Sequence, residues 1–210
     1  MGGLLPARLQ LALIALTLCA VAAVAGVLLA QRSRLEPTSS LQLTNGWAGA
    51  QRPDGQPVPD FTLRDQDGRT VTSASLRGKP VVFAFIYSTC RDTCPAQVQT
   101  IRGALDDLPE ATRDAVRVIG ISVDPANDTD KRAQSFLLKQ QMTGRMQFLL
   151  GSREQLKPVW DAFAIQPQQK TLEHSAHTVL ADARGFQRVG FPFDHLTGEG
   201  LVHDLERLAR

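Results

Sequence analysis

The sequence predicts an α/β domain in which a central β-sheet of mixed direction is covered by helices on both faces. Short apolar runs that suit buried strands, such as 81–87 and 116–123, alternate with segments whose apolar residues recur every three or four positions. The last two strand-like runs, 178–182 and 187–191, flank a turn sequence and therefore add an antiparallel pair. An alternation of this kind gives a sheet packed between layers of helices.

Composition favours a folded domain and excludes nucleic acid as a partner. The chain has 210 residues, of which 43% are hydrophobic and 21% are charged, and its net charge is +2. Lys and Arg are scattered and form no basic stripe of the kind that binds a phosphate backbone. The length suits one well-packed domain with a small appendage.

The segment 9–30 is predicted to be a single transmembrane helix. It contains no charged residue, and as a helix it would reach about 33 Å, close to the thickness of a bilayer core. A cleaved signal peptide is the alternative, because small residues at 20–25 could supply a cleavage site. With an uncleaved anchor, residues 1–8 form a short cytoplasmic N-terminus and residues 31–59 form a flexible tether. Residues 60–210 then form the domain, on the extracytoplasmic (periplasmic or extracellular) side of the cell membrane.

The domain is predicted to open with a β-hairpin, followed by a buried strand and an amphipathic helix. Short strands at 60–63 and around Val71 flank the turn 65–68. The strand 81–87 follows, and Pro95 suits the first turn of the next helix, where a missing amide hydrogen costs little. The apolar residues of that helix share one face and are Val98, Ile101, Leu105 and Leu108.

Two further strand–helix units are expected next. The strand 116–123 precedes a helix that either Asp128 or Thr129 caps, and the strand 147–150 precedes a helix that Ser152 caps. Ser152 is followed three residues later by glutamine, as in a capping box.

A proline inside the second of these helices conflicts with the pattern, and a hairpin and a helix end the chain. Pro158 predicts a kink or a late helix start. The terminal hairpin joins strands 178–182 and 187–191, and the last helix buries Leu201, Val202, Leu205 and Leu208. The resulting order, ββ then βαβαβα then ββα, is that of a thioredoxin-like fold with an N-terminal hairpin extension.

Cys90 and Cys94 are the residues that most clearly indicate chemistry. They lie in the turn between strand 81–87 and the next helix, where the helix dipole and free amide hydrogens favour thiolate. Polar residues between them make simple packing a poor explanation, and a purely structural disulfide closing so short a loop gains little stability. Their three-residue gap differs from the two-residue gap of thioredoxin-type redox pairs. Since two thiolates rarely complete a metal site, we expect a third ligand.

His174 is the predicted third ligand. In a thioredoxin-like fold, the loop that enters strand 178–182 lies against the cysteine turn, and His174 falls in that loop. Two thiolates and one imidazole make a soft, three-coordinate set, which suits Cu(I) better than harder ions, whereas zinc usually takes a fourth ligand. Cu(II) is the alternative when an oxygen ligand is added.

These segments together resemble the SCO/SenC family of copper chaperones for cytochrome c oxidase assembly. The resemblance spans nearly all of residues 60–210. It rests on Gly78-Lys79-Pro80, Tyr87-Ser88-Thr89-Cys90-Arg91-Asp92-Thr93-Cys94-Pro95, Ile121-Ser122-Val123-Asp124-Pro125 with Asp128-Thr129, Leu149-Leu150-Gly151-Ser152 and Glu173-His174-Ser175. It implies a membrane-tethered domain that binds copper through Cys90, Cys94 and His174 and helps to mature the dinuclear copper centre of an oxidase subunit. The implied partners are the copper ion and an oxidase subunit or another copper chaperone.

Two features leave room for redox chemistry at the same site. In an oxidising compartment, Cys90 and Cys94 are expected to form a disulfide that cannot bind copper well. His177 stands where thiol oxidoreductases of this fold carry a cis-proline, and we expect it to modulate the site without being a required ligand. The sequence thus predicts a metallochaperone without catalytic residues. The alternative is a membrane-anchored thiol–disulfide oxidoreductase that acts on partner proteins.

Overall fold

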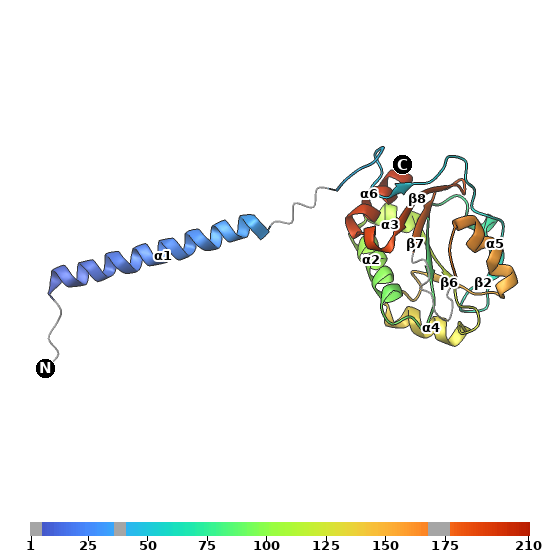
Figure 1. The fold of residues 1–210 in the computed structure, drawn as a ribbon, viewed down its shortest axis with the longest axis horizontal. Coiled ribbons are helices and arrows are strands. Elements are labelled where there is room, and N and C mark those ends of the chain that lie inside the picture. The colour runs from blue at the N-terminus through green and yellow to red at the C-terminus, as the bar shows by residue number, and fades with distance from the viewer. Residues whose placement is uncertain (1–5, 36–40, 168–176) are drawn as a thin grey trace. The chain divides into compact units, whose positions relative to one another are not determined.

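The computed structural model describes residues 6–35, 41–167 and 177–210 of the chain (Figure 1). These belong to two compact units, Met1–Ser40 and Leu41–Arg210. The first unit contains one long helix, α1 (Ala7–Leu35), which includes the segment predicted to cross a membrane. Among the residues that the structure describes, no helix combines the length and apolarity that membrane crossing requires. The predicted transmembrane helix is therefore not confirmed.

Within the described part of the second unit, a six-stranded mixed sheet forms the centre of the domain (Figure 1). Its strands are β1 (Ala50–Gln51), β4 (Val81–Ile86), β5 (Arg117–Ser122), β6 (Gln147–Leu149), β7 (His177–Ala181) and β8 (Gln187–Pro192). Their order is β1-β8-β7-β4-β5-β6. β4, β5 and β6 run parallel, whereas β7 is antiparallel to β4 and β8 is antiparallel to both β7 and β1. The predicted sheet of mixed direction is confirmed.

Both faces of β4 are buried, because helices cover the sheet on each side. Alternate side chains of a strand point to opposite faces, so Val82 and Ile86 join one core cluster and Phe83 and Phe85 join the other. The first cluster is completed by α2 (Thr93–Asp107), α4 (Asp130–Lys139) and α6 (Gly198–Leu208). The second is completed by α5 (Arg153–Phe163), with Trp160 almost wholly buried. Figure 1 shows α2 and α6 on one side of the sheet and α5 on the other.

The predicted N-terminal hairpin forms, and it packs as a separate two-stranded sheet. β2 (Thr62–Arg64) pairs antiparallel with β3 (Thr70–Thr72), and the short 3-10 helix η1 (Ala74–Leu76) follows. Leu63 and Val71, which face each other across the hairpin, are both buried in the core cluster shared with α5. The hairpin is thus part of the layer that covers one face of the main sheet.

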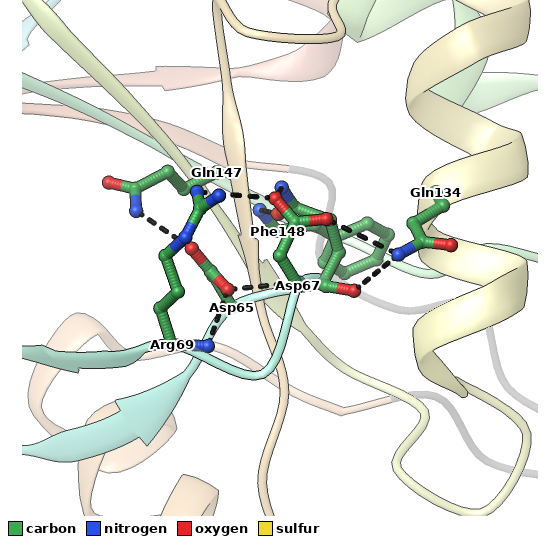
Figure 2. Close-up of polar contacts among 7 residues, drawn as sticks. Asp65, Asp67, Arg69, Gln134, Gln147 and Phe148 are labelled. Carbon is green, nitrogen blue, oxygen red and sulfur yellow. Dashed lines mark hydrogen bonds and ion pairs between the residues drawn. The ribbon is translucent and has the colours of Figure 1, made fainter.

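The turn of this hairpin is organised by a buried carboxylate (Figure 2). One oxygen of Asp65 accepts hydrogen bonds from the amides of Asp67 and Arg69, both at 2.9 Å, and the other accepts from Gln147 Nε2 at 3.1 Å. Gln134 on α4 donates to Asp67 Oδ1 at 3.2 Å. Figure 2 shows these side chains converging from the turn, β6 and α4. Because the carboxylate of Asp65 is fully buried, these bonds offset its lost hydration and fix the turn against the sheet.

The folded unit also extends N-terminal to residue 60. Residues 50–51, which lie in the segment expected to be a tether, form β1 and pair with β8. The fully buried carboxylate of Asp204 on α6 accepts hydrogen bonds from the amides of Ala48 at 2.9 Å and Gly49 at 3.0 Å. Bonds to a buried charged acceptor are stronger than neutral ones, so they hold this strand at the edge of the sheet.

The predicted helix starts are mostly confirmed, with local differences. Thr129 caps α4, since its side chain accepts from the amide of Arg132. Ser152 caps α5 in the expected capping box, and α5 begins at once and continues through Pro158, so the late start is wrong. α2 begins at Thr93, two residues before Pro95.

Three short helices of the described residues, η1, α3 and η2, were not predicted. α3 (Glu110–Ala115) contains no buried residue, and η2 (Phe193–His195) is a single 3-10 turn that also buries none. Because neither presents an apolar face to the core, neither gives the periodic pattern from which helices are predicted.

Candidate functional site

Three segments meet where the carboxyl ends of the inner strands β4 and β5 lie side by side. Ile86 and Ser122, the last residues of these parallel strands, are paired in register. β7 runs the opposite way, so its first residues lie at the same end of the sheet, where Thr178 pairs with Ala84. The turn that carries the two cysteines leaves β4 here, and it therefore lies beside the loop after β5 and the start of β7.

The two cysteines occupy different environments within this turn. The amide of Cys90 donates to the carbonyl of Tyr87 at 3.3 Å, which closes the turn after β4. Cys94 lies in the first turn of α2, and its amide donates to the sulfur of Cys90 at 3.2 Å. Cys90 keeps 9% of its surface exposed, whereas Cys94 is fully buried. Cys90 is thus the more accessible sulfur.

The pKa values of the two thiols are shifted in opposite directions. The hydrogen bond from the Cys94 thiol lowers the pKa of Cys90 to about 4, against the effect of burial, and the amides of Asp92 and Cys94 add to the lowering. Burial raises the pKa of Cys94, and its hydrogen bond to Cys90 raises it further. A thiolate on Cys90 and a proton on Cys94 therefore form one coupled pair.

A buried carboxylate fastens the cysteine turn to the sheet. Asp128 Oδ1 accepts from the amide of Ser88 at 2.7 Å and from its hydroxyl at 2.5 Å. Asp128 Oδ2 accepts from the hydroxyl of Ser122, the last residue of β5, at 2.5 Å. Burial raises the pKa of Asp128, while these three hydrogen bonds lower it. Ser88 lies two residues before Cys90, so this link restricts where the first sulfur can lie.

A buried glutamine joins the cysteine helix to β7. Gln97 lies three residues after Cys94 on α2, and its Nε2 donates to the carbonyl of His177 and to the hydroxyl of Thr178, both at 2.9 Å. Neither Gln97 nor Asp128 was predicted to contribute to the site. The sequence held one signal for Gln97, because it is a polar residue on an otherwise apolar face of α2. A buried side-chain amide needs hydrogen-bond partners, so its position predicts contacts with a neighbouring segment.

His177, the predicted modulator, is half-buried at the start of β7. Its Nδ1 atom is buried and has no hydrogen-bond partner in the described residues. Burial lowers the pKa of His177, the charge of Arg52 lowers it further, and Asp194 opposes them. Neither thiol is among the groups that shift this pKa, so an influence of His177 on the cysteines stays a prediction.

The structure brings Cys90 and Cys94 together but does not test the third ligand. His174 lies in residues 168–176, outside the described residues. Within the described residues, no group of three His, Cys, Asp or Glu side chains is arranged to hold a metal ion. All three cysteines are free thiols, and Cys19 lies on α1, in the other unit.

Comparison with known proteins identifies relatives of the whole domain. The family model described as SCO1/SenC matches residues 49–210. The copper-bound structure of ScoI from Bradyrhizobium japonicum is 29% identical, with a TM-score of 0.62 over 72% of this chain and 99% of that chain. BsSco, described as a member of the Sco family of cytochrome c oxidase assembly proteins with a disulfide switch, is 24% identical, with a TM-score of 0.66 over 75% of this chain and 96% of that chain. The predicted thioredoxin-like architecture is thereby confirmed.

Curated sequences give a similar result over shorter regions. The mitochondrial SCO1 homolog 1 of Arabidopsis thaliana is 29% identical over 119 residues, which cover 57% of this chain and 35% of that protein. The chain spans less than two thirds of the length of the curated relatives it matches.

We predict that Cys90 reacts with iodoacetamide much faster than Cys94 and that its rate changes little between about pH 6 and pH 8. An ordinary thiol, with a pKa near 8.5, would react about tenfold faster for each added pH unit in this range. Because the pKa of Cys90 is lowered to about 4, its thiolate form is already complete at the lower pH.

The measurement is mass spectrometry of the full-length chain carrying Cys19→Ser, with Cys90→Ser and Cys94→Ser as single-thiol controls. If removal of Cys94 left the Cys90 profile unchanged, the hydrogen bond between the thiols would not be the cause of the shift. Faster modification of Cys94 would contradict the assignment of the accessible sulfur.

Proposed function

Because the chain belongs to the SCO1/SenC family, we propose that it is a metallochaperone that binds copper and helps to mature the copper centre of cytochrome c oxidase. The observation that carries this proposal is the pair of sulfurs held in one turn, with the Cys94 amide donating to Cys90 at 3.2 Å. Thiolates are soft ligands, and they select Cu(I) over hard cations such as Mg²⁺ and Ca²⁺. Copper is the cargo in this proposal and undergoes no reaction there.

The proposed ligand set is Cys90, Cys94 and His174. Cys90 supplies a thiolate with a lowered pKa, whereas Cys94 has a raised pKa and must release its proton when it binds the ion. His174 would supply the imidazole that a pair of thiolates lacks, and Cu(II) would need a further oxygen ligand. Copper affinity should therefore fall as the pH falls, since protons compete for the Cys94 sulfur.

A thiol–disulfide oxidoreductase is the second candidate, and the asymmetry of the thiols favours it. Thiol–disulfide exchange needs an accessible attacking thiolate and a partner thiol that can resolve the mixed disulfide. Cys90 keeps 9% of its surface exposed and has a lowered pKa, whereas Cys94 is fully buried. The two candidates differ in their need for His174, because exchange between sulfurs uses no imidazole ligand.

We predict that the full-length reduced chain binds one Cu(I) ion and that Cys90→Ser or Cys94→Ser abolishes tight binding. One thiolate and one imidazole are too few for a tight Cu(I) site. His174→Ala should weaken binding by at least about a hundredfold, since even changes outside the ligand set cost about 10- to 100-fold. His177→Ala should have only a slight effect, and Cys19→Ser should have none.

The measurement is competition with a Cu(I) chelator, repeated after mild oxidation of the protein. Oxidation to the Cys90–Cys94 disulfide should remove most of the affinity. Full affinity in the Cys90→Ser/Cys94→Ser double variant would refute the proposed site. A larger loss in His177→Ala than in His174→Ala would show that the imidazole ligand is misassigned.

We predict that deletion of the gene lowers cytochrome c oxidase activity, that added copper partly restores it, and that His174→Ala does not rescue the deletion. A chaperone needs all three ligands, whereas an oxidoreductase keeps its cysteine pair in this variant. Oxidase activity and copper content of isolated membranes are the readouts. Full rescue by His174→Ala, or copper-independent catalytic reduction of a protein disulfide by the purified chain, would favour the oxidoreductase instead.

We further propose that residues 9–30 anchor the chain in a membrane, because this stretch contains no charged residue. An alkaline carbonate wash should leave the full-length chain with the membranes, while a variant lacking 9–30 should be released. The N-terminus of the mature protein, determined by mass spectrometry, should be uncleaved. Release of the full-length chain by carbonate would contradict the anchor, and a new N-terminus near residues 20–25 would indicate a signal peptide.

A further inference from the structure

A pocket of about 450 Å³ opens directly beside Cys90, between the cysteine turn and α4. On one side it is lined by Cys90 and Arg91. On the other side the lining comes from a single stripe of α4, with Arg132, Phe136 and Lys139 spaced so that they share one helix face. Phe136 is almost wholly buried, so the base of the pocket is closed by the core. Cys90 is the one proposed copper ligand among the described residues that line this pocket.

Apart from the Cys90 thiolate, every charged side chain that lines this pocket is a cation. Arg91, Arg132 and Lys139 line it, and none of its described lining residues is acidic. Arg132 donates to the carbonyl of Asn127 at 2.7 Å, whereas Arg91 and Lys139 make no hydrogen bond or ion pair with any described residue. Elsewhere on the described surface, arginines such as Arg145 are paired with carboxylates. Three cations and one thiolate in the lining leave a net positive charge, which attracts anions.

We propose that this pocket docks an acidic segment of the protein that exchanges copper with Cys90, an inference that rests on the proposed function. Arginine binds carboxylates through two parallel N–H groups, and Ser135 adds a hydroxyl to the same lining. Carboxylates next to the copper ligands of the partner would place those ligands against the accessible sulfur. The pocket would thereby select which proteins exchange copper with this chain.

The spacing of the cations favours a polypeptide over a small anion. Arg132 and Lys139 are seven residues apart on α4, which corresponds to about 10 Å along the helix axis. A single phosphate or carboxylate would contact both only if the two long side chains converged on it. In an extended segment, side chains on the same face are about 7 Å apart, so two or three acidic residues can reach the cations together.

The exchange itself requires no change in oxidation state. Two sulfur–copper bonds form with the cysteine thiolates of the docked segment. The bonds to the proposed ligands Cys90, Cys94 and His174 break, and each electron pair stays on the donor atom of this chain. The two protons of the incoming thiols pass to solvent, and the thiol pair of this chain takes up one proton after the ion has left. Copper remains Cu(I) throughout, so no oxidant or reductant is needed.

The test compares two synthetic peptides that share a cysteine pair and differ only in flanking residues, four glutamates in one and four glutamines in the other. The copper-loaded full-length chain should transfer Cu(I) to the glutamate peptide about tenfold faster at low ionic strength. High salt should remove the difference, because it screens exposed charges. Arg132→Glu should abolish the preference while copper stoichiometry stays unchanged.

Lys131→Glu is the matched control. Lys131 is also exposed, lies next to Arg132 in the first turn of α4, and does not line the pocket. An added glutamate is tolerated electrostatically at either position of a helix start. The control should keep the preference for the glutamate peptide. A preference that survives Arg132→Glu, or that both variants lose equally, would overturn the proposal.

A copper-free measurement separates failure of the pocket from failure of the proposed function. Both proteins in this comparison carry Cys19→Ser, and one of them also carries Arg132→Glu. The reagent dithionitrobenzoate carries two carboxylates, so it should react with Cys90 faster in the chain that keeps Arg132. The rate with dithiodipyridine, which carries none, should not change. If the wild type binds no copper but shows this pattern, the anionic preference stands while the metallochaperone proposal falls. A different result would assign the pocket to a small anion and refute peptide docking. In that case copper transfer would be equal for the two peptides, and citrate would slow the reaction of Cys90 with dithionitrobenzoate but not with dithiodipyridine.

Discussion

The buried carboxylate of Asp128 is the constraint on which the geometry of the cysteine turn depends. It accepts hydrogen bonds from Ser88 in the turn and from Ser122 at the end of β5. A buried charge is costly unless it is hydrogen-bonded, so these contacts are needed together. From the other face of the sheet, Trp160 donates to the carbonyl of Ser122 at 2.9 Å. The turn is therefore fixed relative to both helical layers before any ligand binds.

The hydrogen bond from the Cys94 thiol contributes most to the lowered pKa of Cys90, and the start of α2 adds a further contribution through backbone amides. The first amides of a helix need acceptors, and these are usually supplied by the N-cap side chain. Asp92 at the N-cap of α2 makes no such bond, and the sulfur of Cys90 accepts from the amide of Cys94 in its place. The charge on this sulfur thus helps to cap the helix. A ligand that withdraws electron density from Cys90 weakens this cap, which couples the state of the sulfur to the start of α2.

Sequence reasoning predicted the features that periodicity and local motifs specify. The unbroken apolar runs, the capping box at Ser152 and the cysteine pair are properties of neighbouring residues. β1, two residues long and exposed, and α3, with no buried residue, carry no such pattern. Asp128 was considered as a helix cap and as part of the family resemblance, but not for a contact with the cysteine turn. Its link to Ser88, forty residues earlier, is a contact between distant segments and has no periodic signature.

The charge of the site shows why the surroundings of the two thiols matter as much as the thiols themselves. In the proposed copper site, two thiolates and one Cu(I) ion would carry a net charge of minus one, and the fully buried Cys94 would have to be ionised to reach that state. Burial is the main reason why the pKa of Cys94 is raised, and the negative charges of Cys90 and Asp128 raise it further, so both oppose this ionisation. Asp128 therefore holds the cysteine turn in place through its bonds to Ser88 and Ser122, at an electrostatic cost to the ionisation of Cys94.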